Sequence, residues 1–107
     1  MSWSLQKEDK YTLYSPEFSS EDDLFDAFNA LEVSEHKIID ARNINFTESL
    51  KTRVSAVCQA HLEAQKSFIL VVKTKELMEE LEDLFVVVPT ISEAIDYLYM
   101  EEIERNI

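Results

Sequence analysis

The pattern that most constrains this chain is a strand, a helix and a second strand within residues 37–72. Residues 37–41 are mostly apolar and β-branched, whereas residues 68–72 are apolar without alternation, which is typical of a strand covered on both faces. Between them, apolar residues recur at helical spacing, so one stripe of the helix faces inward. Two parallel strands joined by a helix form a right-handed crossover unit on which other elements can pack. The inward stripe comprises Leu50, Val54, Val57, His61 and Ala64, with Cys58 and Leu62 beside it.

The turn inside this unit, residues 43–49, is polar and lies between the first strand and the helix. Open α/β sheets tend to place their functional sites at the carboxyl ends of strands. We therefore expect any functional site to involve this turn.

Two strands and a helix are predicted before the unit. Residues 2–6 alternate polar and apolar side chains and residues 11–14 are rich in β-forming types, which indicates two short strands or a hairpin. The serines at 19–20, followed by acids at 21–23, indicate a helix N-terminus, because acidic side chains there favour the helix dipole. This helix is predicted to end near residues 33–35. Its buried stripe is predicted to contain Leu24, Ala27, Phe28 and Leu31.

Two helices and a strand are predicted after the unit. Thr74 can cap a short helix with an acidic outer side, and the apolar residues 85–88 form a strand that ends before Pro89. Residues 90–93 fit a capping box that opens the last helix. The end of that helix, residues 100–105, is acidic and is expected to be only partly docked. The side chains predicted to face inward are Ile91, Ala94, Ile95 and Leu98.

The composition favours one folded domain, residues 1–107, because 46% of the residues are hydrophobic. The longest apolar runs, residues 68–72 and 84–89, are far too short to cross a bilayer. No basic segment followed by an apolar stretch opens the chain, so we expect no secretory leader and no membrane partner. Cys58 is the single cysteine, which fits a reducing compartment. We therefore expect a soluble protein of the cytoplasm.

The chain contains no glycine. Phosphate-binding loops, dinucleotide fingerprints and nucleophile elbows all use glycine where the backbone turns tightly or approaches a ligand. None of these motifs is present in its standard form. This argues against the usual nucleotide-using enzymes of the α/β class, and we expect no cofactor.

The net charge is −12, which argues against a nucleic-acid partner. The charge is unevenly distributed, since residues 37–75 hold seven bases and three acids, a net charge of +4, whereas the rest of the chain carries −16. The central unit is therefore the part best suited to an anion or an acidic partner. The plainer interpretation, which we favour, is that a soluble protein must place its few basic residues somewhere.

The order of these elements is similar to that of the STAS domain (sulfate transporter and anti-sigma factor antagonist), especially its small free-standing bacterial members. Those proteins show an apolar strand with an Asp, then an Asp-Ser-x-Gly-Leu-like motif that opens a helix, and then a second apolar strand. A short acidic helix, a further strand and a closing helix led by Glu-Ala follow. The resemblance covers nearly the whole chain. Its matching segments are residues 38–41, 46–52, 68–72, 77–84 and 89–95.

The resemblance implies a STAS-like fold, with a mixed sheet of about five strands and about four helices, and a non-catalytic regulatory function. In that family the unmodified protein binds an anti-sigma factor, commonly a serine-kinase-like protein, and phosphorylation of a serine breaks the complex. Ser49 occupies the phosphoacceptor position here and Glu48 the preceding acid, but Lys51 replaces the family glycine and Thr52 the leucine after it. The implied partner-binding residues are Asn45, Thr47, Glu48, Ser49, Lys51, Thr52 and Arg53.

Ser49 has two interpretations from the residues themselves. Its hydroxyl can cap the backbone of the helix that begins there. Alternatively, a phosphate on Ser49 would face the positive end of the helix, with Lys51 and Arg53 near enough to contribute. A degenerate domain that accepts no phosphate and acts as a constitutive adaptor or a homodimer also stays open.

Cys58 and His61 stand three residues apart on the central helix, a spacing that can supply two metal ligands. No third ligand is evident, and His61 lies within the apolar stripe, so a buried, hydrogen-bonded histidine is the better interpretation. A buried thiol without basic neighbours is inert, which argues against catalysis by this pair. A small metal-dependent hydrolase is therefore a distant alternative. Tyr97 and Met100 are predicted on the outer face of the last helix, where a second copy or another protein can contact them.

Overall fold

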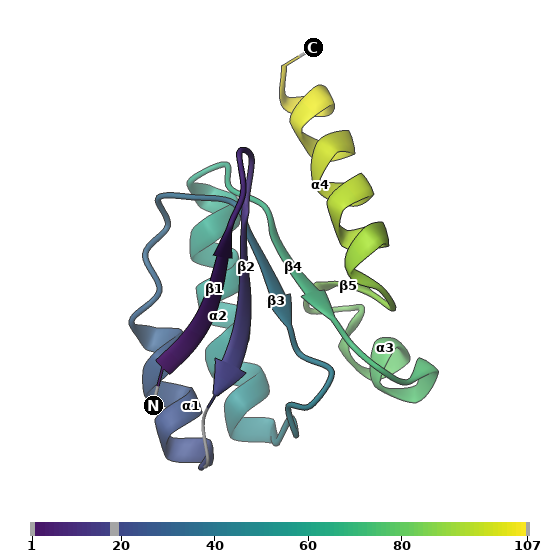
Figure 1. The fold of residues 1–107 in the computed structure, drawn as a ribbon. Helices are drawn as coiled ribbons and strands as arrows, with labels where there is room; N and C mark the ends of the chain where they lie inside the picture. Colours follow the sequence, from purple (N-terminus) through teal and green to yellow (C-terminus); the bar gives the residue numbers. More distant parts are fainter. Residues whose placement is uncertain (1, 18–19, 107) are drawn as a thin grey trace.

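The computed structural model describes residues 2–17 and 20–106. Over these residues the chain forms a five-stranded mixed sheet and four helices (Figure 1), which confirms the predicted α/β architecture. Ser19, one of the two predicted capping serines, lies outside the described residues. In chain order the elements are β1 (Ser2–Lys7), β2 (Thr12–Glu17), α1 (Glu21–Asn29), β3 (Lys37–Asp40), α2 (Glu48–Glu63), β4 (Phe68–Val71), α3 (Lys75–Leu81), β5 (Val86–Val88) and α4 (Ile91–Arg105).

The strands lie in the order β1-β2-β3-β4-β5. β1 and β2 form the predicted antiparallel hairpin, and the other neighbouring strands are parallel. β3 pairs directly with β4, with Ile38 opposite Ile69, so the strand–helix–strand unit is confirmed as a parallel crossover. Parallel pairs of this kind need both faces of the sheet covered.

Helices α1, α2 and α3 share one hydrophobic cluster, and α4 covers the opposite face of the sheet alone. The larger cluster joins Phe28 of α1 and Leu50 of α2 to Leu70 of β4. The smaller cluster packs Ala94 and Leu98 of α4 on Ile38 of β3 and on Ile69 and Val71 of β4. Within residues 2–17 and 20–106, no helix combines the length and the hydrophobicity that a membrane crossing requires.

Each helix begins after a serine or threonine whose hydroxyl accepts a backbone N–H from the first turn. Ser20, Thr74 and Thr90 occupy these positions as predicted. At α2 the cap is Thr47, whose Oγ1 lies 3.2 Å from the amide nitrogen of Leu50. Thr47 is therefore the cap of α2, a role for which Ser49 was also a candidate from the sequence alone.

The first helix ends at Asn29, so the predicted end near residues 33–35 was wrong. The reason is Lys37, which is only 1% exposed and whose Nζ donates to the backbone carbonyl of Glu32 in the segment after the helix. This contact turns the segment after the helix inward, toward the start of β3. The carbonyl of Glu35 lies 3.5 Å from the same ammonium group.

His61 is fully buried and hydrogen-bonded, as predicted. Its Nδ1 lies 2.8 Å from the carbonyl of Val57, so this nitrogen carries the ring proton. Its Nε2 lies 2.8 Å from Nζ of Lys37 and accepts a hydrogen bond from it. Burial lowers the pKa of both side chains, and the Lys37 charge lowers that of His61 further.

One side of the end of α4 is held by a polar network. Ser67, which precedes β4, donates its hydroxyl to Oε1 of Glu101 at 2.6 Å, and Arg105 donates to the same hydroxyl oxygen at 3.2 Å. His36 pairs with Glu102 through Nε2 and accepts the backbone N–H of Ser67 at Nδ1. The expectation that residues 100–105 are only partly docked is therefore confirmed, because this network holds Glu101, Glu102 and Arg105 whereas Met100, Ile103 and Glu104 are exposed.

Both histidines should make the protein less stable in mild acid. Burial lowers the pKa of His36 and of His61 below the ordinary value of 6.5. The unfolded chain then binds more protons than the folded chain as the pH falls below about 6.5, so the free energy of unfolding decreases. Urea unfolding between about pH 7.5 and about pH 5.5, where carboxylates stay largely ionised, measures this decrease.

The matched control is His36→Asn, because the Asn side-chain oxygen can still accept the Ser67 N–H and binds no proton in this range. We expect its stability to depend less steeply on pH than that of the wild type. This explanation would be contradicted if the free energy of unfolding depended equally on pH in the two proteins, or if the wild type became more stable in acid.

Candidate functional site

The candidate site is the 43–53 turn, which we define as the loop after β3 together with the first turn and a half of α2. It lies at the carboxyl edge of the parallel strands, as predicted. Ile44 and Leu50 anchor it in the larger hydrophobic cluster, and Phe46 packs against that cluster. Asn45, Glu48, Ser49 and Thr52 are exposed. The turn therefore presents polar side chains on an apolar base.

Ser49 is the second residue of α2 and is exposed to solvent. Thr47 already caps the helix, and its hydroxyl also donates to the carboxylate of Glu21 on α1. Within the described part of the chain, no side chain or backbone group is hydrogen-bonded to the Ser49 hydroxyl. That hydroxyl is thus free of a structural role at the positive end of a helix.

Lys51 does not face Ser49. Residues two apart on a helix lie on different sides, and Lys51 points toward α3. Its Nζ lies 2.6 Å from Oε1 of Glu80 and 2.7 Å from Oε1 of Glu48, and these two carboxylates raise the pKa of the ammonium group. The expectation that Lys51 would contribute to a phosphate on Ser49 is not met by this arrangement.

Arg53 lies one helical turn after Ser49 and on the same side of α2. Its guanidinium carbon is 4.7 Å from the centroid of the Phe25 ring on α1, a cation–π contact. The Nε atom of Arg53 is buried without a hydrogen-bond partner among the described residues. Arg53 is therefore the basic side chain that the fold brings to the Ser49 side of the turn.

Thr52 and the pair Asp40 and Arg42 at this edge form local hydrogen bonds. Thr52 donates its hydroxyl to the carbonyl of Glu48 at 3.1 Å, within α2. Arg42 binds Asp40 through two hydrogen bonds of 2.8 and 2.9 Å, and this guanidinium lowers the pKa of the Asp40 carboxyl. The acid at the end of β3 is therefore ionised and already paired.

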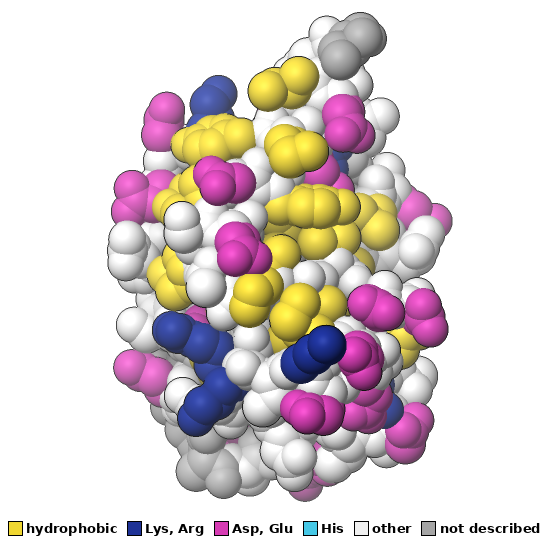
Figure 2. All heavy atoms as spheres, turned by 90° about the vertical axis from the view of Figure 1, so that its right-hand side faces the viewer, with side chains coloured by type: hydrophobic (Ala, Val, Ile, Leu, Met, Phe, Trp, Pro, Cys, Tyr) yellow, Lys and Arg dark blue, Asp and Glu magenta, His cyan; other side chains and the backbone are white. Residues whose placement is uncertain are grey.

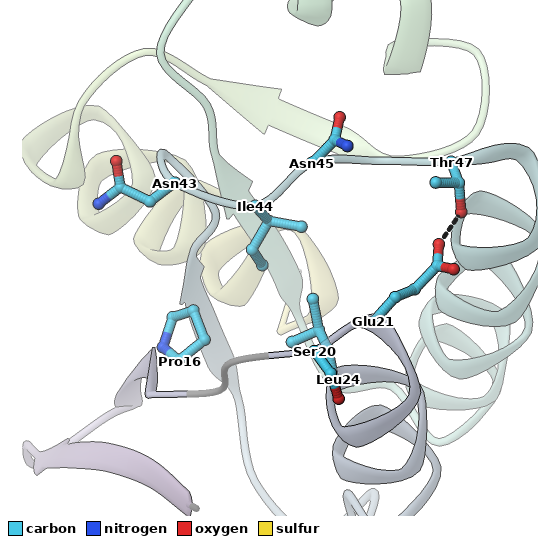
Figure 3. A pocket seen from close by; sticks show the side chains of 8 residues that line it. All are labelled: Pro16, Ser20, Glu21, Leu24, Asn43, Ile44, Asn45 and Thr47. Atoms are coloured by element: carbon cyan, nitrogen blue, oxygen red, sulfur yellow. Dashed lines mark hydrogen bonds between the residues drawn. The ribbon is translucent and has the colours of Figure 1, made fainter.

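An open cavity of about 440 Å³ lies beside the 43–53 turn (Figure 3). The contact between Thr47 and Glu21 joins its two walls. Sequence reasoning missed this cavity, because Ser20, Glu21 and Leu24 were considered only as parts of the first helix and their approach to the 43–53 turn carries no sequence signal. The cavity is lined by Pro16, Ser20, Glu21, Leu24, Asn43, Ile44, Asn45 and Thr47.

Cys58 and His61 are not arranged as a reactive or ligating pair. Burial raises the pKa of the Cys58 thiol to about 11, so it is protonated at neutral pH. Both ring nitrogens of His61 are engaged, by Val57 and Lys37. Among the described residues, no three His, Cys, Asp or Glu side chains are grouped so that they could hold a metal ion.

No family model matches this sequence, and no significant match to it was found among curated proteins.

The two hydroxyls at the start of α2 are distinguishable by stability. Thr47→Ala removes the cap and the contact with Glu21, and we expect it to lower the free energy of unfolding by about 1 kcal/mol. Ser49→Ala also removes a hydroxyl, but one that is exposed and has no partner among the described residues. We therefore expect the free energy of unfolding to change by no more than about 0.5 kcal/mol. Urea denaturation of the two variants measures the difference. The reverse order would show that Ser49, and not Thr47, caps the helix.

Proposed function

We propose that this chain is a non-catalytic regulatory protein of the cytoplasm that binds a kinase-like anti-sigma factor through the 43–53 turn. Phosphorylation of Ser49 by that partner ends the complex. The observation that carries the proposal is the Ser49 hydroxyl, which is exposed, is not used by the fold and stands at the start of a helix. The resemblance to STAS domains supports it, because the elements follow the order that the resemblance implies.

The unmodified turn is suited to a protein partner. Its exposed polar groups, on Asn45, Glu48, Ser49 and Thr52, are held by a backbone anchored in the core through Ile44 and Leu50. A rigid polar surface of this kind can be recognised without a large rearrangement of either protein. The cavity beside it offers a recess for a side chain of the partner.

A phosphate on Ser49 would change this surface in two ways. The positive end of α2 and the guanidinium group of Arg53 would stabilise the added charge on the protein itself. The same charge would lie beside Glu48, whose side chain is 91% exposed, and would repel an acidic surface of the partner. Release of the partner follows from this repulsion and from the bulk of the phosphate, which spoils packing against the partner at Ser49.

The constitutive adaptor is the second candidate, and the position of Lys51 favours it. Lys51 is held between Glu48 and Glu80 on the side of α2 away from Ser49, so it supplies no charge to a phosphate. In this alternative the 43–53 turn binds its partner, or a second copy of the chain, without modification.

Intact mass spectrometry distinguishes the switch from the adaptor. The protein is incubated with ATP, Mg²⁺ and each kinase-like anti-sigma factor encoded by the same genome. We expect the mass of one phosphate to be added to the wild type and to Ser92→Ala, and not to Ser49→Ala. Ser92 is the matched control, because it is also exposed and follows the threonine cap of α4 by two residues, as Ser49 follows that of α2.

Size-exclusion chromatography of the same mixtures gives the second readout. The unmodified wild type should elute with its partner, and Ser49→Asp should elute alone. A stable complex without any added mass would support the constitutive adaptor. A phosphate on Ser49→Ala, or no complex with any of these partners, would contradict the proposed switch.

A further inference from the structure

The outer face of α4 is unusually apolar for a helix that already buries a separate stripe. Ala94 and Leu98 form the inner stripe of α4. They pack on one face of the sheet, and α2 packs on the other. Met100 and Ile103 are nevertheless 57% and 63% exposed, and Tyr99 is 42% exposed. Figure 2 shows hydrophobic side chains gathered in the middle of this side of the molecule. These three residues neighbour one another at helical spacing, so they form one continuous patch.

Acidic side chains lie on the same outer face. Asp96 precedes Met100 by one helical turn, Glu104 follows it by one turn, and both are exposed. Arg105, the only basic residue in the sequence of α4, is turned inward to the hydroxyl of Ser67 and the carboxylates of Glu101 and Glu102. The outer face of α4 is therefore both apolar and negatively charged.

A recess lies at the end of this face. It is a shallow cavity of about 570 Å³ between the tip of the β1–β2 hairpin and the last turns of α4. Tyr99 and Ile103 form its apolar wall, and Lys10 stands on the hairpin side. The space is large enough for one bulky apolar side chain at the edge of the patch.

We propose that the outer face of α4 binds a cationic, amphipathic helical segment of a partner protein. Apolar side chains of that segment cover Tyr99, Met100 and Ile103, and its Lys or Arg side chains pair with Asp96 and Glu104. The charge of this face distinguishes between a second copy of the chain and a cationic segment. A second copy would place acid against acid in a chain of net charge −12, whereas a cationic segment meets complementary charge. This surface is independent of the 43–53 turn and adds a second site for a macromolecule.

The test uses the full chain and a fluorescent synthetic helix made only of Leu and Lys, with one apolar and one basic face. The comparison peptide has the same composition in an order that gives no apolar face. We expect the wild type to bind the amphipathic peptide in fluorescence anisotropy at physiological ionic strength. Met100→Ser with Ile103→Ser should weaken this binding by at least about tenfold, because two largely exposed apolar contacts are lost.

Two control variants separate the patch from general charge. Leu62→Ser removes an apolar residue that is 41% exposed on α2, and we expect it to leave peptide binding unchanged. Asp96→Asn with Glu104→Gln should weaken binding and make it less sensitive to salt. All variants replace exposed side chains, and circular dichroism checks that each one is folded.

Several results would overturn the proposal. Equal binding of the two peptides, or no loss in Met100→Ser with Ile103→Ser, would show attraction by net charge alone. A dimer in sedimentation velocity that this double variant abolishes would identify a second copy as the occupant. Binding to zwitterionic lipid vesicles in preference to the peptide would identify a membrane. The assay contains no anti-sigma factor and no ATP, so failure of the Ser49 switch leaves its result unaffected.

Discussion

Parallel pairing of β3 with β4, buried on both faces, is the constraint on which the rest of the structure depends. Ile38 and Ile39 of β3 and Ile69 and Leu70 of β4 have no exposed surface, so each face of this pair needs its own cover. Neighbouring parallel strands also require a crossover, which here is α2. The start of α2 must then lie at the carboxyl edge of the sheet. Ser49 is exposed there because the chain has just left the core.

Most of the fold could be predicted because its signals are local. Strand and helix periods, and a hydroxyl residue before each helix, give the element order without knowledge of tertiary contacts. The end of α1 was misplaced because the apolar pattern continues through Leu31 and Val33, whereas the structure ends the helix to bring Glu32 to Lys37. A buried lysine cannot be inferred from hydropathy, which assigns every lysine to the surface. Its burial depends on His61, a residue distant in sequence.

The candidate site could be predicted in position but not in detail. The expectation for Arg53 agrees with its place one helical turn after Ser49, whereas the expectation for Lys51 failed because residues two apart lie on different sides of a helix. The groups that hold these two basic side chains, Phe25 and Glu80, come from α1 and α3 and carry no sequence signal of their own. The cavity likewise joins the start of α1 to the loop after β3. Such features arise only when helices pack together, so they require the structure.

The claim at the centre of this interpretation is that a protein partner contacts the 43–53 turn. Backbone NMR of the isotope-labelled protein, titrated with an anti-sigma factor that binds it, tests this claim most directly. We expect the amide signals of residues 45–53 to shift or broaden first. After phosphorylation of Ser49, these signals should match those of the phosphorylated protein without its partner. A complex that forms while these signals stay unchanged would contradict the claim and place the interface elsewhere on the domain.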